Sequence, residues 1–206
     1  MNIGSKEYIE HHKQEILTML SKVNREGIEG LLKYLNESDF FTCPASSYYH
    51  ANHPGGLAFH SLNLTKIALH LNKMFKLNLP EESIIIAGIC HDLCKVGTYN
   101  LETKWQKDKN NKWQSYLTYV NVTKPCCQHG PQSALIAARY IRLTEQEEQA
   151  ICWHMGSYGQ SEYENKVMNN SMKENHLILI IQQADMSSAY FYEKTFDKDK
   201  IPGLDL

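Results

Sequence analysis

The stretch from Ile84 to Gly97, IIIAGICHDLCKVG, constrains the fold more than any other part of the chain. It begins as an apolar run just after Glu81 and Glu82, a pattern that predicts a helix buried on most sides. Its far end carries His91 and Asp92. A carboxylate taken out of water without a partner costs several kcal/mol. Asp92 therefore needs an arginine, a lysine, N–H donors or a metal ion, unless Asp92 simply caps a turn and His91 makes a core hydrogen bond.

Apolar residues at helical spacing predict further helices around this run. The expected helices cover residues 6–24, 27–35, 57–77, 131–142, 144–154 and 177–192, the last two opened by capping boxes at Thr144–Glu147 and Ser171–Glu174. Residues 99–122 read as a β-hairpin, residues 157–170 as a polar loop, and residues from 194 onward as a frayed tail. The loop at 40–56 is long enough to suggest a functional role. We therefore expect an all-α bundle with a small hairpin, in one domain spanning 1–206.

Composition limits the partners of this chain. The 206 residues carry a net charge of −2, so no broad affinity for nucleic acid or anionic membranes is indicated. No apolar run is long enough to span a bilayer, and the first residues contain no apolar signal core. The six cysteines include no Cys-x-x-Cys pair, which favours reduced thiols in a cytoplasmic protein over a structural zinc site. Cys90 and Cys94 are interpreted as packing residues.

Three more histidines and a second acid are expected to point inward: His60, His154 and Asp185, within a predicted helix or at its end, and His129, just ahead of one. His60 lies on an apolar helix face, and Asp185 lies one turn from Ile181. Each of them alone is explained at least as well by a core hydrogen bond or a solvent-facing position, and for His60 the core hydrogen bond is the better explanation. Because the chain has only three arginines, a cation shared by these side chains, His91 and Asp92 is the more economical account.

The order of these residues resembles that of the HD-domain metal-dependent phosphohydrolases. The resemblance rests on GGLAFH, which ends at His60, on HDLCKVG, and on the later Asp185, and it covers about residues 55–189. Small bacterial and phage HD hydrolases, and the HD domain attached to certain 3′–5′ exoribonucleases, are similar. Cys94 departs from the pattern, where glycine is common. Exonuclease activity is not carried over, since no separate nuclease or nucleic-acid-binding domain is apparent.

The resemblance implies a compact HD-domain helical bundle that holds one or two divalent transition-metal ions. The first ion would be held by His60, His91, Asp92 and Asp185, and the second by His129, His154 and a bridging Asp92. Nitrogen and carboxylate ligands suit Mn, Fe, Co, Ni or Zn, and the identity of the metal stays open. The oligomeric state is also left open.

The activity implied is attack of metal-activated water on a phosphate ester of a nucleotide or related small phosphorylated molecule. Asp92 would hold the metal. Lys95 would contact the phosphate, unless it is a surface lysine, and His129 (or His154) would act as a general acid if one ion binds. His53 and Tyr158 are candidates for substrate binding. Two other functions stay open: a di-iron oxygenase of the same superfamily, and a non-catalytic nucleotide-binding module.

Overall fold

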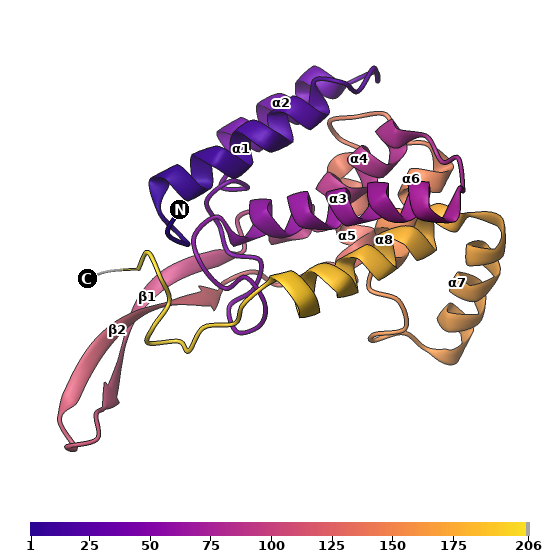
Figure 1. Ribbon diagram of the computed structural model, residues 1–206. Coiled ribbons are helices and arrows are strands. Elements are labelled where there is room, and N and C mark those ends of the chain that lie inside the picture. Colours follow the sequence, from indigo (N-terminus) through magenta and orange to yellow (C-terminus); the bar gives the residue numbers. More distant parts are fainter. Residues whose placement is uncertain (205–206) are drawn as a thin grey trace.

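The central apolar run forms a helix that other helices enclose. The structure is a computed structural model that describes residues 1–204. Helix α4 (Glu81–Cys90) contacts α3 (Gly56–Phe75), α6 (Glu145–Trp153) and α8 (His176–Ser187), as Figure 1 shows. Every residue from 83 to 90 is buried, as the sequence predicts. The helix ends at Cys90, so that the His-Asp pair begins a turn at the centre of the bundle.

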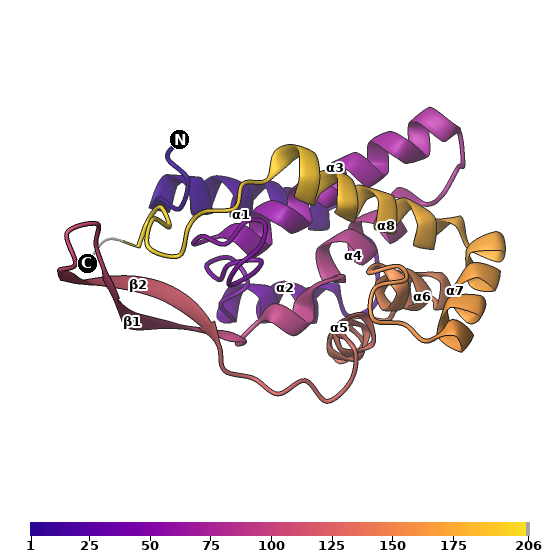
Figure 2. The same ribbon diagram turned by 90° about the horizontal axis from the view of Figure 1, so that it is seen from below.

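The fold is mostly helical, which confirms the expected class. The remaining elements of residues 1–204 are α1 (Lys6–Leu20), α2 (Ile28–Glu37), a 3₁₀ turn (Leu93–Lys95), α5 (His129–Ala137), α7 (Glu162–Glu174), a π-helical turn (Ser188–Tyr192) and one two-stranded sheet. Helices α3 and α8 lie side by side along much of the body in both Figure 1 and Figure 2. Every helix of the described part is too short or too polar to cross a membrane.

The predicted hairpin is present. Strands β1 (Tyr99–Lys107) and β2 (Trp113–Asn121) pair antiparallel, and both views show them projecting away from the helices. Trp105 and Trp113 stand on this arm with more than half of their surface exposed. These two aromatic side chains therefore do not fill the core.

Two sequence expectations about residues 157–175 are wrong. Residues 157–170 are not one loop, because helix α7 begins at Glu162 after a capping box formed by Ser161 and Glu164. Ser171 lies inside α7, and Asn175 caps α8 instead. Both S-x-x-E sequences fit a capping box equally well. Helix α7 is mostly polar and buries only Met168, so little of it is held in the core.

Residues 194–201 also contact the body, where the sequence predicts a frayed tail. The side chain of Asn52 donates to the carbonyl oxygen of Phe196 and accepts from its N–H, both at 2.8 Å. The N–H of Ala51 donates to the carbonyl oxygen of Lys194 at 2.9 Å, and Ile201 is buried. These contacts are made to a loop more than 140 positions away. The local sequence pattern around residues 194–201 therefore does not predict them.

The loop before α3 is drawn tightly onto that helix. Gly55 adopts a φ of +74°, a conformation that favours glycine. A Cβ on Gly56 would overlap the carbonyl oxygen of Ala51. The glycine pair therefore lets the loop at 40–56 turn back over α3 and brings His50 beside His60, with ring centroids 4.7 Å apart.

A buried ion pair joins the connection between α1 and α2 to the helices around α4. The guanidinium of Arg25 contacts both carboxylate oxygens of Glu147, at 2.8 and 3.0 Å, and Glu82 at 2.7 Å. The side chain of Glu147 is fully buried, and it also closes the capping box of α6. One of the three arginines is therefore committed to this pair.

We predict that Arg25→Met strongly destabilises the fold. The substitution leaves the Glu147 carboxylate buried without a cation, a change that costs about 3–5 kcal/mol. Arg142→Met is the matched control, because Arg142 pairs with Glu26 on the surface and such pairs contribute about 0–1 kcal/mol. Urea unfolding of both variants measures the difference. Equal midpoints for the two variants would contradict the importance of the buried pair.

Candidate metal centre

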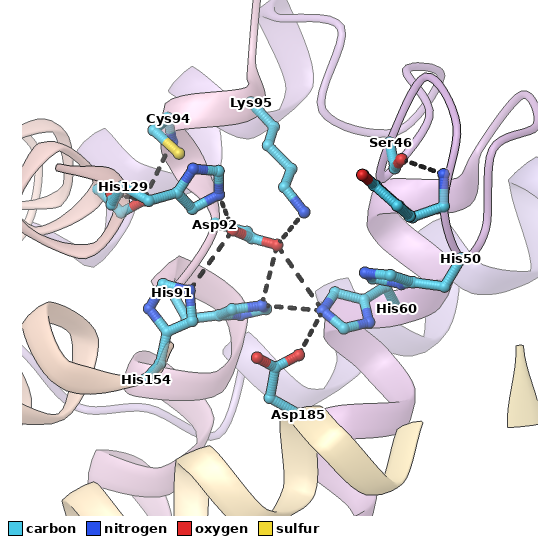
Figure 3. Close-up of polar contacts among 12 residues, drawn as sticks. Ser46, His50, His60, His91, Asp92, Cys94, Lys95, His129, His154 and Asp185 are labelled. Atoms are coloured by element: carbon cyan, nitrogen blue, oxygen red, sulfur yellow. Dashed lines mark hydrogen bonds and ion pairs between the residues drawn. The ribbon is translucent and has the colours of Figure 1, made fainter. Parts of the chain in front are cut away.

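Histidines and acids from five helices meet at the centre of the bundle, as Figure 3 shows. His60 comes from α3 and Asp185 from α8. His91 and His154 each follow the last residue of a helix, α4 and α6 respectively. The remaining two are Asp92, next to His91, and His129, the first residue of α5. The helices and their ends thus place side chains that are far apart in the sequence around one point.

One group of ligand atoms surrounds His60. Its Nε2 lies 3.0 Å from Nε2 of His91, 3.1 Å from Oδ1 of Asp185 and 3.7 Å from Oδ2 of Asp92. Oδ2 of Asp92 is also 3.2 Å from Nε2 of His91. Ligands about 2.0–2.2 Å from a common ion lie roughly 3.0–3.6 Å apart at octahedral or tetrahedral angles. The spacing of this first group therefore fits a shared divalent ion.

A second group of ligand atoms surrounds the other carboxylate oxygen of Asp92, Oδ1. This oxygen is 2.8 Å from Nε2 of His129 and 3.7 Å from Nε2 of His154. The Sγ of Cys94 belongs to the same neighbourhood, since its ligand atom and those of Asp92 and His129 lie within 4.8 Å of one another. Asp92 thus faces both groups, one oxygen to each. Cys94 adjoins the centre, where the sequence suggests only packing.

The ring orientations show which nitrogens face the centre. Nδ1 of His91 lies 2.8 Å from the carbonyl oxygen of Gly88, and Nδ1 of His154 lies 2.7 Å from that of Ile151. A carbonyl oxygen only accepts hydrogen bonds, so both Nδ1 atoms carry the hydrogen and both Nε2 atoms of the neutral rings keep a free lone pair. Nε2 of His154 is buried and has no hydrogen-bond partner. A buried, unpaired nitrogen of this kind is satisfied by a metal ion.

The two acids of the centre are held ionised. Burial opposes the charge on Asp92, but Lys95, His91 and His129 outweigh it and hold the pKa of Asp92 well below its usual range. Burial likewise opposes the charge on Asp185, and the neighbouring His60 lowers the pKa of Asp185 to about 2. The centre therefore presents anionic oxygens at neutral pH.

The histidines differ among themselves. Burial disfavours protonation of His60, but Glu193 and Asp185 raise the pKa of His60 to about 10. His129 behaves alike, because Asp92 outweighs burial and raises the pKa of His129 to about 10. For His154, burial and the neighbouring His91 lower the pKa to about 4. The acids thus favour a positive charge on His60 and on His129, whereas His154 stays neutral.

The site residues that the sequence predicts besides the metal ligands, Lys95, His53 and Tyr158, lie in three different environments. Lys95 is buried, and its Nζ lies 2.6 Å from Oδ2 of Asp92. His53 is also buried, but it packs against the rings of Tyr8 and Phe196 and is not among the ligand groups of the described residues. Tyr158 is exposed and, with His129, lines a cavity of about 190 Å³. The structure therefore brings Lys95 to the centre, places Tyr158 near it, and keeps His53 in the core.

Two residues that lie beside His60, Glu193 and His50, are not predicted from the sequence as part of the site. The carboxylate of Glu193 accepts from Nδ1 of His60 at 2.8 Å and contacts Nδ1 of His50 at 2.5 Å. His50 could have been suspected, because it stands in the loop expected to be functional. Glu193 follows a run of exposed aromatic residues at the edge of a polar tail, and this position carries no signal of burial.

Comparisons with protein-family models, with curated proteins and with solved structures find no match to this chain. What the chain can do therefore has to be inferred from its own geometry. The buried histidines and aspartates lie close enough together to hold a metal ion.

We predict that Asp92→Ala abolishes metal binding. The substitution removes the oxygens that face both groups and leaves Lys95 buried beside the remaining histidines. Elemental analysis after loading with Mn²⁺ and gel filtration reports the ions retained per chain. His70→Ala is the control, because His70 is exposed on the same helix as His60 and should retain the wild-type content. Undiminished metal in Asp92→Ala would place the ion elsewhere.

A separate prediction concerns His154. Its Nε2 belongs to the second group and lies 3.7 Å from Oδ1 of Asp92, whereas the first group is complete without it. His154→Ala should therefore lose a second ion and keep the first. The same elemental analysis, compared with wild type, tests this expectation. Loss of all metal in a folded His154→Ala protein would contradict the division into two groups.

Proposed function

We propose that this protein is an HD-type metal-dependent phosphohydrolase that hydrolyses a phosphate ester of a nucleotide or a related small phosphorylated molecule. The observation that carries the proposal is the position of Asp92, whose two oxygens face two groups of histidines while a buried lysine stands beside it. The ligand order along the chain, with GGLAFH and HDLCKVG, is the order of the resemblance described above. Together, geometry and order favour hydrolysis over a purely structural ion.

The side chains of the first group would hold one ion: His60, His91, Asp92 and Asp185. A bound transition-metal ion lowers the pKa of water from about 16 to about 7 and withdraws charge from phosphoryl oxygens. His129, His154 and Oδ1 of Asp92 would hold a second ion. Because both acids are ionised well below neutral pH, the protein keeps its ligand oxygens free of protons in the pH range where such enzymes work.

Lys95 is the residue best placed to orient the phosphate. Its ammonium group lies against Oδ2 of Asp92, on the side of the centre opposite Asp185 in Figure 3. Lysine acts as a compact charge that stabilises negative oxygens. Asp92 raises the pKa of Lys95 against the effect of burial, so the side chain stays charged.

His129 is the better proton donor of the two outer histidines when one ion binds. Its side chain is 40% exposed, whereas His154 is buried. The pKa of His129 is raised to about 10 by Asp92, against the effect of burial, so the ring carries a proton at neutral pH. The pKa of His154 is lowered to about 4, so that ring is neutral at pH 7 and its Nε2, which faces the centre, carries no proton. His129 would therefore protonate the leaving oxygen.

The cavity beside His129 offers room for the rest of the substrate. Cys152, Met155 and the ring of Tyr158 give it an apolar lining. Planar rings stack on tyrosine, so a nucleobase suits this lining better than a bare sugar phosphate does. This feature favours a nucleotide among the small phosphorylated molecules considered.

The test of the function is release of phosphate from a generic ester by protein loaded with Mn²⁺. We predict turnover by wild type, none by His91→Ala, and none after chelation and dialysis, since the ion supplies the Lewis acid. His70→Ala should behave as wild type. Full turnover after removal of the metal would contradict the proposal. Oxygen consumption by iron-loaded protein without phosphate release would instead support the di-iron oxygenase.

A further prediction isolates Lys95. Lys95→Met removes the charge but keeps most of the side-chain volume, and it should lower kcat/KM by about 10²–10³-fold, as removal of one preorganised charge does. Metal content should remain, because no ligand is lost. Lys112→Met, on the exposed tip of the hairpin, is the control. Unchanged kcat/KM in metal-loaded Lys95→Met would exclude a role on the phosphate.

A further inference from the structure

Glu193 is a buried carboxylate outside both ligand groups. It follows the π-helical turn at the end of α8, and its side chain is fully buried. Oε1 accepts from Nδ1 of His60 and from the hydroxyl of Ser188, and Oε2 contacts Nδ1 of His50. Each of these partners is a hydrogen-bonding group rather than a compensating lysine or arginine.

We propose that Glu193 is the positioning residue of the metal centre, which fixes the ring of His60 so that Nε2 points at the ion. A carboxylate only accepts, so Nδ1 of His60 carries a hydrogen, and Nε2, which faces His91 and Asp185, is the nitrogen left to ligate an ion. Carboxylates that accept from a ligating histidine orient the ring and strengthen it as a ligand.

The position of His60 within its helix explains why a carboxylate is needed there. His91 and His154 stand at helix ends, where the carbonyl oxygens of the last turn lack a helical partner and accept from Nδ1. His60 is the fifth residue of a helix of 20 residues, and the carbonyl oxygens next to it accept the helix's own N–H groups. Its Nδ1 is bonded to an acceptor from another part of the chain, the carboxylate of Glu193.

The C-terminal segment holds Glu193 in place. The bonds from Ala51 to Lys194 and from Asn52 to Phe196 tie residues 194–196 to the loop that carries His50. His50 occupies the second oxygen of Glu193 and so prevents the carboxylate from turning away. Residues 50–52 and 193–196 thus act together as a clamp on His60.

The test compares wild type, Glu193→Gln and the exposed control Glu174→Gln by titrating metal-free protein with Co²⁺ and following the visible absorption of the bound ion. The amide introduced by Glu193→Gln would present an N–H group to one of the two histidines from which the carboxylate accepts. We expect Co²⁺ to bind Glu193→Gln about 10–100-fold more weakly with unchanged stoichiometry. Glu174→Gln should match wild type, since Glu174 is exposed at the end of α7.

A purely structural role would lower the thermal stability of metal-free Glu193→Gln without changing Co²⁺ affinity, and this result would overturn the proposal. If Glu193→Gln does not fold, Glu193→Asp keeps the charge, withdraws it from His60 by one methylene, and should show the same weaker binding. Loss of one ion with unchanged affinity for the rest would make Glu193 a ligand itself, which also overturns the proposal.

The role of Glu193 rests on the proposed metal centre and not on the proposed reaction. Wild type that binds no Co²⁺ would remove both the centre and its clamp. Wild type that binds Co²⁺ more tightly than Glu193→Gln but releases no phosphate would refute the phosphohydrolase and leave the clamp intact. The two failures are therefore distinguished by the same protein preparations.

Discussion

The buried carboxylate of Asp92 is the constraint on which the rest of the centre depends. An aspartate just beyond a helix that is buried from residue 83 to residue 90 has to be surrounded by positive charge or by donors, since leaving it unpaired costs several kcal/mol. The chain meets this requirement with Lys95 and with histidine rings on its other sides. Arg25 is bound to Glu147 and Glu82, so this arginine does not take part. The environment that stabilises Asp92 is thus also one in which a divalent ion fits.

Helix ends supply much of the rigidity of this centre. A histidine one position beyond a helix can fix its ring on a free carbonyl oxygen of the last turn, and both His91 and His154 do so. Such a bond needs no further residue, and it selects the tautomer that leaves Nε2 available. Short helices that stop at the same depth in a bundle are therefore an economical way to aim several imidazoles at one point.

The sequence predicts the parts of this arrangement that follow local periodicity. The apolar stripe of α3 places His60 inside, and the apolar run of α4 places His91 and Asp92 at a buried helix end. Helix α7 is not among the predicted helices, because it is mostly polar and buries only Met168. Glu193 could not be recognised either, because its burial depends on pairing between two segments separated by more than 140 positions.

His60, His91 and His154 are held by different acceptors, and this difference affects which of the three rings can move. His91 and His154 are fixed within their own helices, so their orientation survives as long as α4 and α6 do. His60 is fixed through Glu193, which belongs to a segment with few buried residues beyond α8. Segments with few buried contacts open more readily than the core. Loosening of residues 193–196 would free the ring of His60 and leave His91 and His154 in place. Binding of an ion at the proposed centre would then depend on the C-terminal segment more than the stability of the helical body does.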